Sequence, residues 1–123
     1  MITNARILFI YPISLSFLLL ASFGKDNKTL KINDFTETKI IKLEPYKNYP
    51  YSMMNIWVKG QVNDTIFLRL NSLDSKPILK LSGKIDERWY TDYYGGGAKT
   101  IIFDPYKATK GSLEIKATLR KIK

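Results

Sequence analysis

The clearest pattern in the chain runs over residues 54–70, which read MNIWVKGQVNDTIFLRL. Apolar or small residues occupy every second position from Met54 to Val62, with Asn, Trp, Lys and Gln between them. After Asn-Asp-Thr the same alternation resumes from Ile66 to Leu70. A period of two is typical of a β-strand with one buried face. The pattern therefore predicts two strands that turn their apolar sides to one core.

We expect the two segments to form a β-hairpin, because a short polar stretch separates them. Directly opposed residues of a hairpin share a face, so the length of the loop sets which residues pair. A two-residue loop would set Val58 against Arg69, an apolar residue against a charged one. A three-residue loop at 63–65 sets Val58 against Leu70 and keeps the apolar faces together. The three-residue loop is therefore the prediction.

Further strand-like segments flank this pair, separated at short intervals by Pro, Gly, Asn and Asp, which favour turns. They lie at 38–44, 79–85, 99–103 and 113–119, with a lead-in or first edge strand at 25–34. No amphipathic helix is visible after the N-terminal region. The spacing predicts an all-β fold, an antiparallel β-sandwich of jelly-roll or Ig-like type with about 7–8 strands or a small barrel.

Residues 1–24 have the order of parts of a signal peptide. Arg6 is the one charged residue among them, an uncharged stretch follows, and Ser22 and Gly24 supply small residues at a cleavage site. We expect a mature single domain of residues 25–123 that is secreted or periplasmic. An uncleaved transmembrane anchor is the alternative, and only in that case do we expect membrane contact.

The composition excludes several chemistries. The chain has no Cys and no His, which removes disulfides, lipoprotein anchoring, thiolate or His metal sites, and Cys or His catalysis. An acidic group at Asp86, Glu87 and Asp92 lacks the spacing of a calcium loop, and a domain of this size leaves little room for a glycosidase cleft. We therefore expect a protein with no catalytic residues, no cofactor and no metal site.

The charge is strongly basic. The net charge of the full chain is +9, carried by 20 basic and 11 acidic residues. Such a surface attracts polyanions, so an acidic glycan or an acidic protein is a candidate partner. Sixteen of the basic residues are Lys and four are Arg. Because base and phosphate recognition favours Arg, and because export is expected, we expect no nucleic-acid partner. The alternative is a solvated Lys surface that protects sheet edges.

An aromatic run supplies the candidate binding site. Four rings within six residues precede Gly95-Gly96-Gly97, and aromatic side chains can stack on sugars or anchor a protein partner. A second group of rings at Tyr46, Tyr49 and Tyr51 is available to join them. The alternative is that alternate rings fill the core. The candidate binding residues are Trp89, Tyr90, Tyr93, Tyr94 and Lys99.

The closing part of the chain carries a resemblance. Phe103-Asp104-Pro105-Tyr106 is followed by Gly111-Ser112-Leu113-Glu114-Ile115. In these two segments and in the spacing of the predicted strands, residues 59–119 resemble small exported bacterial β-sandwich modules of the pre-peptidase C-terminal type. The resemblance implies an exported β-sandwich and brings no site residue with it.

Two functions from different classes follow. The first is a small exported, non-catalytic binding protein of the bacterial envelope or exterior, which contacts a glycan or a protein partner through the aromatic loop. The second is a periplasmic inhibitor or immunity protein that blocks a hydrolase by inserting a loop.

Overall fold

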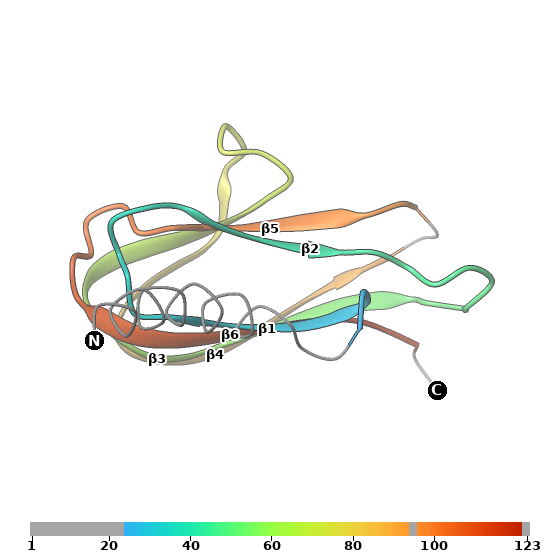
Figure 1. The fold of residues 1–123 in the computed structure, drawn as a ribbon, viewed down its shortest axis with the longest axis horizontal. Helices are drawn as coiled ribbons and strands as arrows, with labels where there is room; N and C mark the ends of the chain where they lie inside the picture. The colour runs from blue at the N-terminus through green and yellow to red at the C-terminus, as the bar shows by residue number, and fades with distance from the viewer. Residues whose placement is uncertain (1–23, 94–95, 122–123) are drawn as a thin grey trace, which may run out of the picture.

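The structure, a computed structural model, describes residues 24–93 and 96–121. Residues 1–23, which make up nearly all of the expected signal peptide, lie outside this range. The described residues form six strands and no helix, so the all-β prediction is confirmed (Figure 1). No helix in this part of the chain is of the length and hydropathy that crossing a membrane needs. The strands are β1 (Asn27–Ile32), β2 (Lys39–Leu43), β3 (Met53–Leu70), β4 (Pro77–Asp92), β5 (Lys99–Asp104) and β6 (Gly111–Arg120).

All strand pairs are antiparallel, and the sheet has the order β1-β6-β3-β5-β2, with β4 also paired to β3. The first half of β3 pairs with β6 and the second half with β5, while β4 follows both halves. The sheet thus folds over on itself along β3, and Figure 1 shows β2 and β5 above β1, β6 and β3. At the open side the Glu44 N–H donates to the Lys25 carbonyl over 2.7 Å. The result is a nearly closed barrel.

The predicted hairpin at 63–65 is wrong, and a sandwich of seven or eight strands is not confirmed. The two alternating segments are one strand, β3, which runs through residues 63–65 without turning back. Val62 lies opposite Gly83 and Ile66 opposite Leu81, so β3 carries extra residues here against β4. A bulge bends a strand without ending it. Counting the segments separately therefore gave one strand too many.

The polar bulge has a structural role that a turn would not have. The side-chain oxygen of Asn63 accepts hydrogen bonds from the backbone N–H groups of Thr109 and Lys110, over 2.9 and 3.1 Å. Its amide nitrogen donates to the Thr109 hydroxyl over 2.8 Å. Asn63 therefore holds the β5–β6 connection against the bend of β3.

The core follows the predicted alternation. The inward positions of β3 are almost fully buried, and they are Met54, Ile56, Val58, Val62, Ile66 and Leu68. Gly60 interrupts this series for a steric reason. Its φ is 140°, and a Cβ atom there would lie 2.0 Å from the Ser112 carbonyl oxygen of β6. Only glycine lets the two backbones approach this closely.

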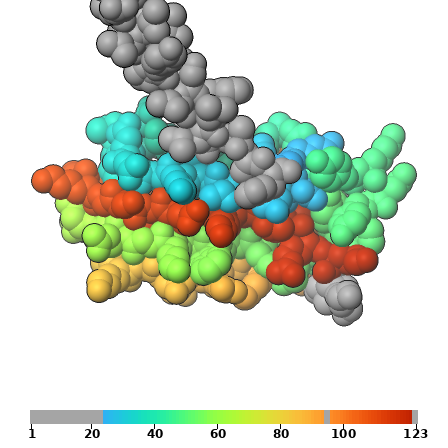
Figure 2. All heavy atoms as spheres, turned by 60° about the horizontal axis from the view of Figure 1, so that its bottom comes forward, coloured from blue at the N-terminus to red at the C-terminus, as the bar shows by residue number. Residues whose placement is uncertain are grey.

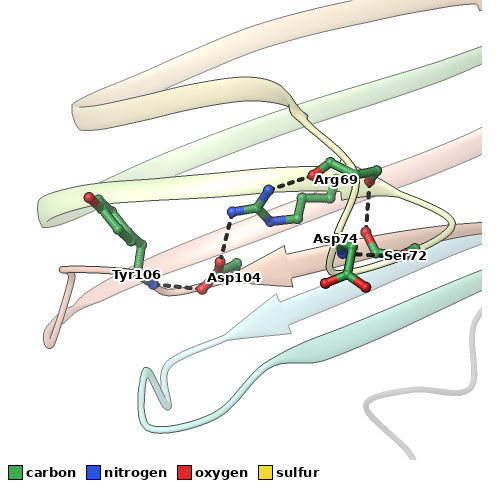
Figure 3. Close-up of polar contacts among 6 residues, drawn as sticks. Arg69, Ser72, Asp74, Asp104 and Tyr106 are labelled. Carbon is green, nitrogen blue, oxygen red and sulfur yellow. Dashed lines mark hydrogen bonds and ion pairs between the residues drawn. The ribbon is translucent and has the colours of Figure 1, made fainter.

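The β3–β4 loop, residues 71–76, projects from the barrel (Figure 1) and is tied back to it by Arg69. The guanidinium of Arg69 donates to the Ser75 carbonyl over 2.6 Å and forms an ion pair with Asp104 over 3.4 Å (Figure 3). Within the loop, the Ser75 hydroxyl donates to the Ser72 carbonyl and the Asp74 N–H to the Ser72 hydroxyl. The loop thus has a defined shape.

Candidate functional site

The structure places the residues of the predicted aromatic site on opposite sides of the sheet. Alternation along β4 turns Trp89 inward, where it lies opposite Ile56 and packs against the core. The same alternation turns Tyr90 outward, opposite Asn55, with 53% of its surface exposed.

Tyr93 also points inward. Only 2% of its surface is exposed, its hydroxyl donates to the Gly97 carbonyl over 2.8 Å, and burial raises its pKa. The Lys99 ammonium lies 5.9 Å from the centroid of the Tyr93 ring. Tyr94 lies outside the described residues. Trp89, Tyr93 and Lys99 are therefore separated from Tyr90, which alone of the described candidates faces solvent on the outer sheet surface.

The second Tyr-rich loop joins Tyr93 as the sequence suggested. The rings of Tyr51 and Tyr93 meet edge to face, with centroids 5.9 Å apart, beside an open hollow of about 620 Å³. The Tyr51 hydroxyl donates to Asp26 over 2.8 Å and accepts from the Tyr46 N–H over 2.9 Å. The hydroxyls of Tyr51 and Tyr93 thus both form hydrogen bonds within the protein.

The outer face of β1, β6, β3 and β4 is the better candidate. Figure 2 shows these strands side by side across one side of the molecule. Cross-strand pairing arranges their outward residues in rows. One row consists of Asn27, Thr118, Asn55 and Tyr90, and the next of Thr29, Lys116, Trp57 and Arg88. We call this surface the Trp57 face.

Trp57 gathers three cations. The Arg88 guanidinium carbon lies 4.1 Å from the centroid of the indole ring, and the ammonium nitrogens of Lys116 and Lys59 lie 5.3 and 5.5 Å from it. All three distances are within the range of cation–π attraction. The indole N–H donates to Asp86 over 2.6 Å, which fixes the ring on the sheet. The ring therefore holds positive groups from three strands at one place.

A groove of about 450 Å³ lies beside this cluster. Its charged lining residues are all basic, namely Arg88, Lys116 and Arg120. Of the acidic residues on this face, Asp86 and Glu114 lie one row beyond Trp57, and Asp92 lies opposite Met53 at the other end. Among the described residues, none of the three basic residues that line the groove forms an ion pair with a carboxylate.

Asn55, one of the residues that line the groove, has an unpartnered acceptor. The side-chain oxygen of Asn55 is buried and has no hydrogen-bond partner within the described part of the chain. The neighbouring Thr118 hydroxyl donates to Asn27 over 3.4 Å. Buried polar atoms are almost always paired in native proteins, so this oxygen lacks a partner that a ligand donor can supply once the amide turns toward the groove.

Two further hollows lie past Trp57 along β3. A small hollow at Trp57 and Lys59 lies next to the groove, and a larger one of about 500 Å³ extends from Lys59 to Lys84. Unlike the groove, these two hollows are lined in part by carboxylates, those of Glu114 and Asp86.

Comparison with known proteins does not assign the chain to a family. No protein-family model matches it, and no curated protein matches it at a significant level. Among the described residues, no group of three or more acidic side chains is placed to hold a metal ion.

Sequence reasoning did not select Trp57 as a site residue. The available signal was its position among Asn55, Lys59 and Gln61, the solvent side of the best-defined alternation in the chain. A tryptophan on the polar side of a strand is unusual enough to note, because large apolar residues are mostly turned inward. The partners of Trp57 come from β4 and β6, and no local pattern indicated them.

Proposed function

We propose that the protein is a small exported, non-catalytic binding protein that holds an acidic polymer, of the glycan class, on the Trp57 face. The observation that carries the proposal is the cluster of Arg88, Lys116 and Lys59 within 5.5 Å of one indole centroid.

The electrostatics favour an acidic ligand. Like charges held close together repel, and the attraction of each exposed cation to the ring is worth only about 0.5–1 kcal/mol. An anion placed among Arg88, Lys116 and Lys59 relieves this repulsion and forms charge-assisted hydrogen bonds. A neutral sugar would have to stack on a ring that the Arg88 guanidinium already covers at 4.1 Å. The site thus favours charge recognition over simple stacking.

Export and the absence of catalysis are parts of the same proposal. The leader pattern at residues 1–24 supports export, and the lack of His and Cys removes the commonest catalytic groups. Lys25 and Asp26 contact Glu44, Leu119 and Tyr51, and cleavage after Gly24 leaves these contacts intact. Mass spectrometry of protein recovered from the periplasm or medium should give a chain that begins at Lys25. A chain that keeps residues 1–24 in the membrane fraction would contradict export in cleaved form.

Binding is tested with matched polymers and matched charge changes. Calorimetry should show binding of polygalacturonate and no binding of dextran, a neutral polymer. The Arg88→Gln, Lys116→Gln double variant should weaken binding by about tenfold or more, which corresponds to at least about 1.4 kcal/mol. The control is Lys42→Gln, Lys76→Gln, which removes the same charge from β2 and from the β3–β4 loop. Equal losses in the two double variants, or equal binding of dextran, would contradict the proposal.

The β3–β4 loop favours a second candidate, a hydrolase inhibitor. The loop projects from the barrel (Figure 1), its shape is fixed by Arg69 and Ser75, and Leu73 within the loop is 54% exposed. A preformed loop loses little entropy when it enters a cleft. An assay of lysozyme activity with added protein tests this. Inhibition that Leu73→Ser abolishes would support the inhibitor role, and lack of inhibition by the unchanged protein would remove it for that enzyme.

A further inference from the structure

We infer that the groove between Trp57 and Asn55 is a subsite for one uronic-acid ring. The carboxylate of the sugar is bound by Arg88 and Lys116, and a ring hydroxyl donates to the side-chain oxygen of Asn55, whose amide turns from its buried position toward the groove. This inference rests on the proposed function and narrows its ligand from acidic polymers in general to polymers that also carry hydroxyl groups.

The Asn55 oxygen requires a donor. A buried acceptor without a partner destabilises the folded state, so the unliganded protein carries this penalty. The protein does not supply the donor, because the Thr118 hydroxyl, next to Asn55 in the same row, donates its one proton to Asn27. Across the strand on the other side, Tyr90 forms no hydrogen bond to Asn55 within the described residues. A hydroxyl or N–H group of the ligand can satisfy this oxygen.

The distance between Asn55 and the cations at Trp57 matches the distance between a hydroxyl and the carboxylate of one sugar ring. Asn55 and Trp57 are two residues apart on one face of β3, a distance of about 7 Å along the strand. Arg88 and Lys116 flank Trp57 from the two neighbouring strands. A sugar ring that reaches from the Asn55 row to the Trp57 row can present a hydroxyl at one side and its carboxylate at the other. The two requirements of the groove are thereby met by one residue of the polymer.

Tyr90 forms an aromatic wall of the groove. Its ring is 53% exposed and lines the groove with Arg88 and Asn55. The carbon–hydrogen face of a pyranose ring is apolar and packs on aromatic rings, whereas a bare phosphate or sulfate has no such face. Charge, an unpaired acceptor and an aromatic wall therefore occur together in a volume of about 450 Å³. Polyphosphate satisfies only the first of the three.

The inference is tested by comparing two polymers that have carboxylates in common and differ in hydroxyls. Polygalacturonate carries both groups, and polyacrylate carries carboxylates alone. At equal carboxylate concentration and fixed salt, the protein should bind polygalacturonate about tenfold more tightly. Polygalacturonate whose ring hydroxyls are acetylated keeps its carboxylates and loses its donors, so it should bind with the affinity of polyacrylate. This ligand-side comparison needs no change in the protein.

Asn55→Leu tests the same contact from the protein side. Leucine has a similar volume and no acceptor, so the preference for polygalacturonate over polyacrylate should fall to near one. The melting temperature should stay level or rise, because an unpaired buried oxygen is removed. The control is Gln61→Leu, two rows beyond Trp57 on the same strand, which should keep the preference. If Asn55→Leu fails to fold, the acetylated polymer decides the result.

The outcomes separate the two proposals. If the unchanged protein binds polyacrylate as tightly as polygalacturonate, the uronic-acid subsite is wrong and the acidic-polymer function stands. If it binds neither polymer, the proposed function itself is wrong. If Asn55→Leu keeps the full preference, the hydroxyl is not read by Asn55 and the inference is overturned.

Discussion

Arg88 lies directly across the β3–β4 pair from Trp57, and its guanidinium carbon is 4.1 Å from the centroid of the indole ring. Lys116 lies opposite Trp57 on the other neighbouring strand, β6. One aromatic side chain of the central strand thus orders cations from strands on both its sides. Trp57 therefore positions the neighbouring cations, and replacing Trp57 should affect binding more than folding.

Trp57→Leu is expected to weaken polygalacturonate binding by about tenfold, since the cations lose the ring that holds them together. The free energy of unfolding should change by less than about 1 kcal/mol, because the ring lies on the outer face. Trp89→Leu is the contrasting change, since Trp89 packs against the core. It should lower the free energy of unfolding by about 1–3 kcal/mol and leave the binding of the folded protein unchanged. Calorimetry and urea denaturation measure the two quantities, and a reversed pattern would contradict the assignment.

Gly60→Ala should be among the most destabilising single changes in the chain. The new Cβ would lie 2.0 Å from the Ser112 carbonyl oxygen, and φ is 140°. Backbone strain of about 1–3 kcal/mol adds to overpacking of about 1–3 kcal/mol. Gly97→Ala is the matched control, since nothing lies within 4 Å of its added Cβ. Equal urea midpoints for the two variants would show that β3 and β6 do not approach as described.

Arg69 should control the shape of the β3–β4 loop. Arg69→Leu removes the hydrogen bond to the Ser75 carbonyl and the ion pair with half-buried Asp104 (Figure 3). We expect a loss of about 1–3 kcal/mol, because the Asp104 carboxylate is left without its partner. Limited proteolysis should then cut within residues 71–76 faster than in the unchanged protein. Cleavage at the unchanged rate would mean that the loop holds its shape without Arg69.

Tyr93 should make the protein sensitive to alkaline pH. Burial raises the pKa of Tyr93 above the ordinary value of 10.0. The stabilisation that comes from this shift is complete below pH 10 and is lost as pH rises through the folded-state pKa. The free energy of unfolding should therefore fall at alkaline pH, and Tyr93→Phe should reduce this fall. Burial is also the main cause that raises the pKa of Tyr51. Tyr51→Phe should therefore reduce the part of the alkaline loss of stability that Tyr93→Phe leaves. An unchanged pH profile in both variants would contradict this origin.

The strands were largely predictable, and the path of the chain at residues 63–65 was not. Alternation indicated the segments that became β2 and β6, because one face of each is buried. A short apolar run indicated β5, where Ile101, Ile102 and Phe103 are all buried. The same alternation could not separate a hairpin from a bulged continuous strand at 63–65. Val62 and Ile66 face the core in either case, since four residues keep the same parity. The difference lies in long-range pairing with Gly83 and Leu81, which has no local signal.

The candidate site was less accessible to sequence reasoning than the fold. A dense aromatic run attracts notice, but alternation along β4 sends Trp89 inward and Tyr90 outward. The Trp57 face is assembled from single outward residues on four strands, each ordinary in its own segment. Its chemistry arises only when register places Arg88 and Lys116 beside Trp57.

The most direct test of the acidic-polymer site is the indole N–H signal of Trp57 in a nitrogen–proton correlation spectrum during titration with oligogalacturonate. The chain has two tryptophans, Trp57 on the outer face and Trp89 against the core, so the second signal is an internal reference. A saturable shift of the Trp57 signal, with the Trp89 signal nearly unchanged, is the predicted result. A Trp57 signal that does not move while the protein binds the oligomer would show that binding occurs elsewhere and would contradict the account.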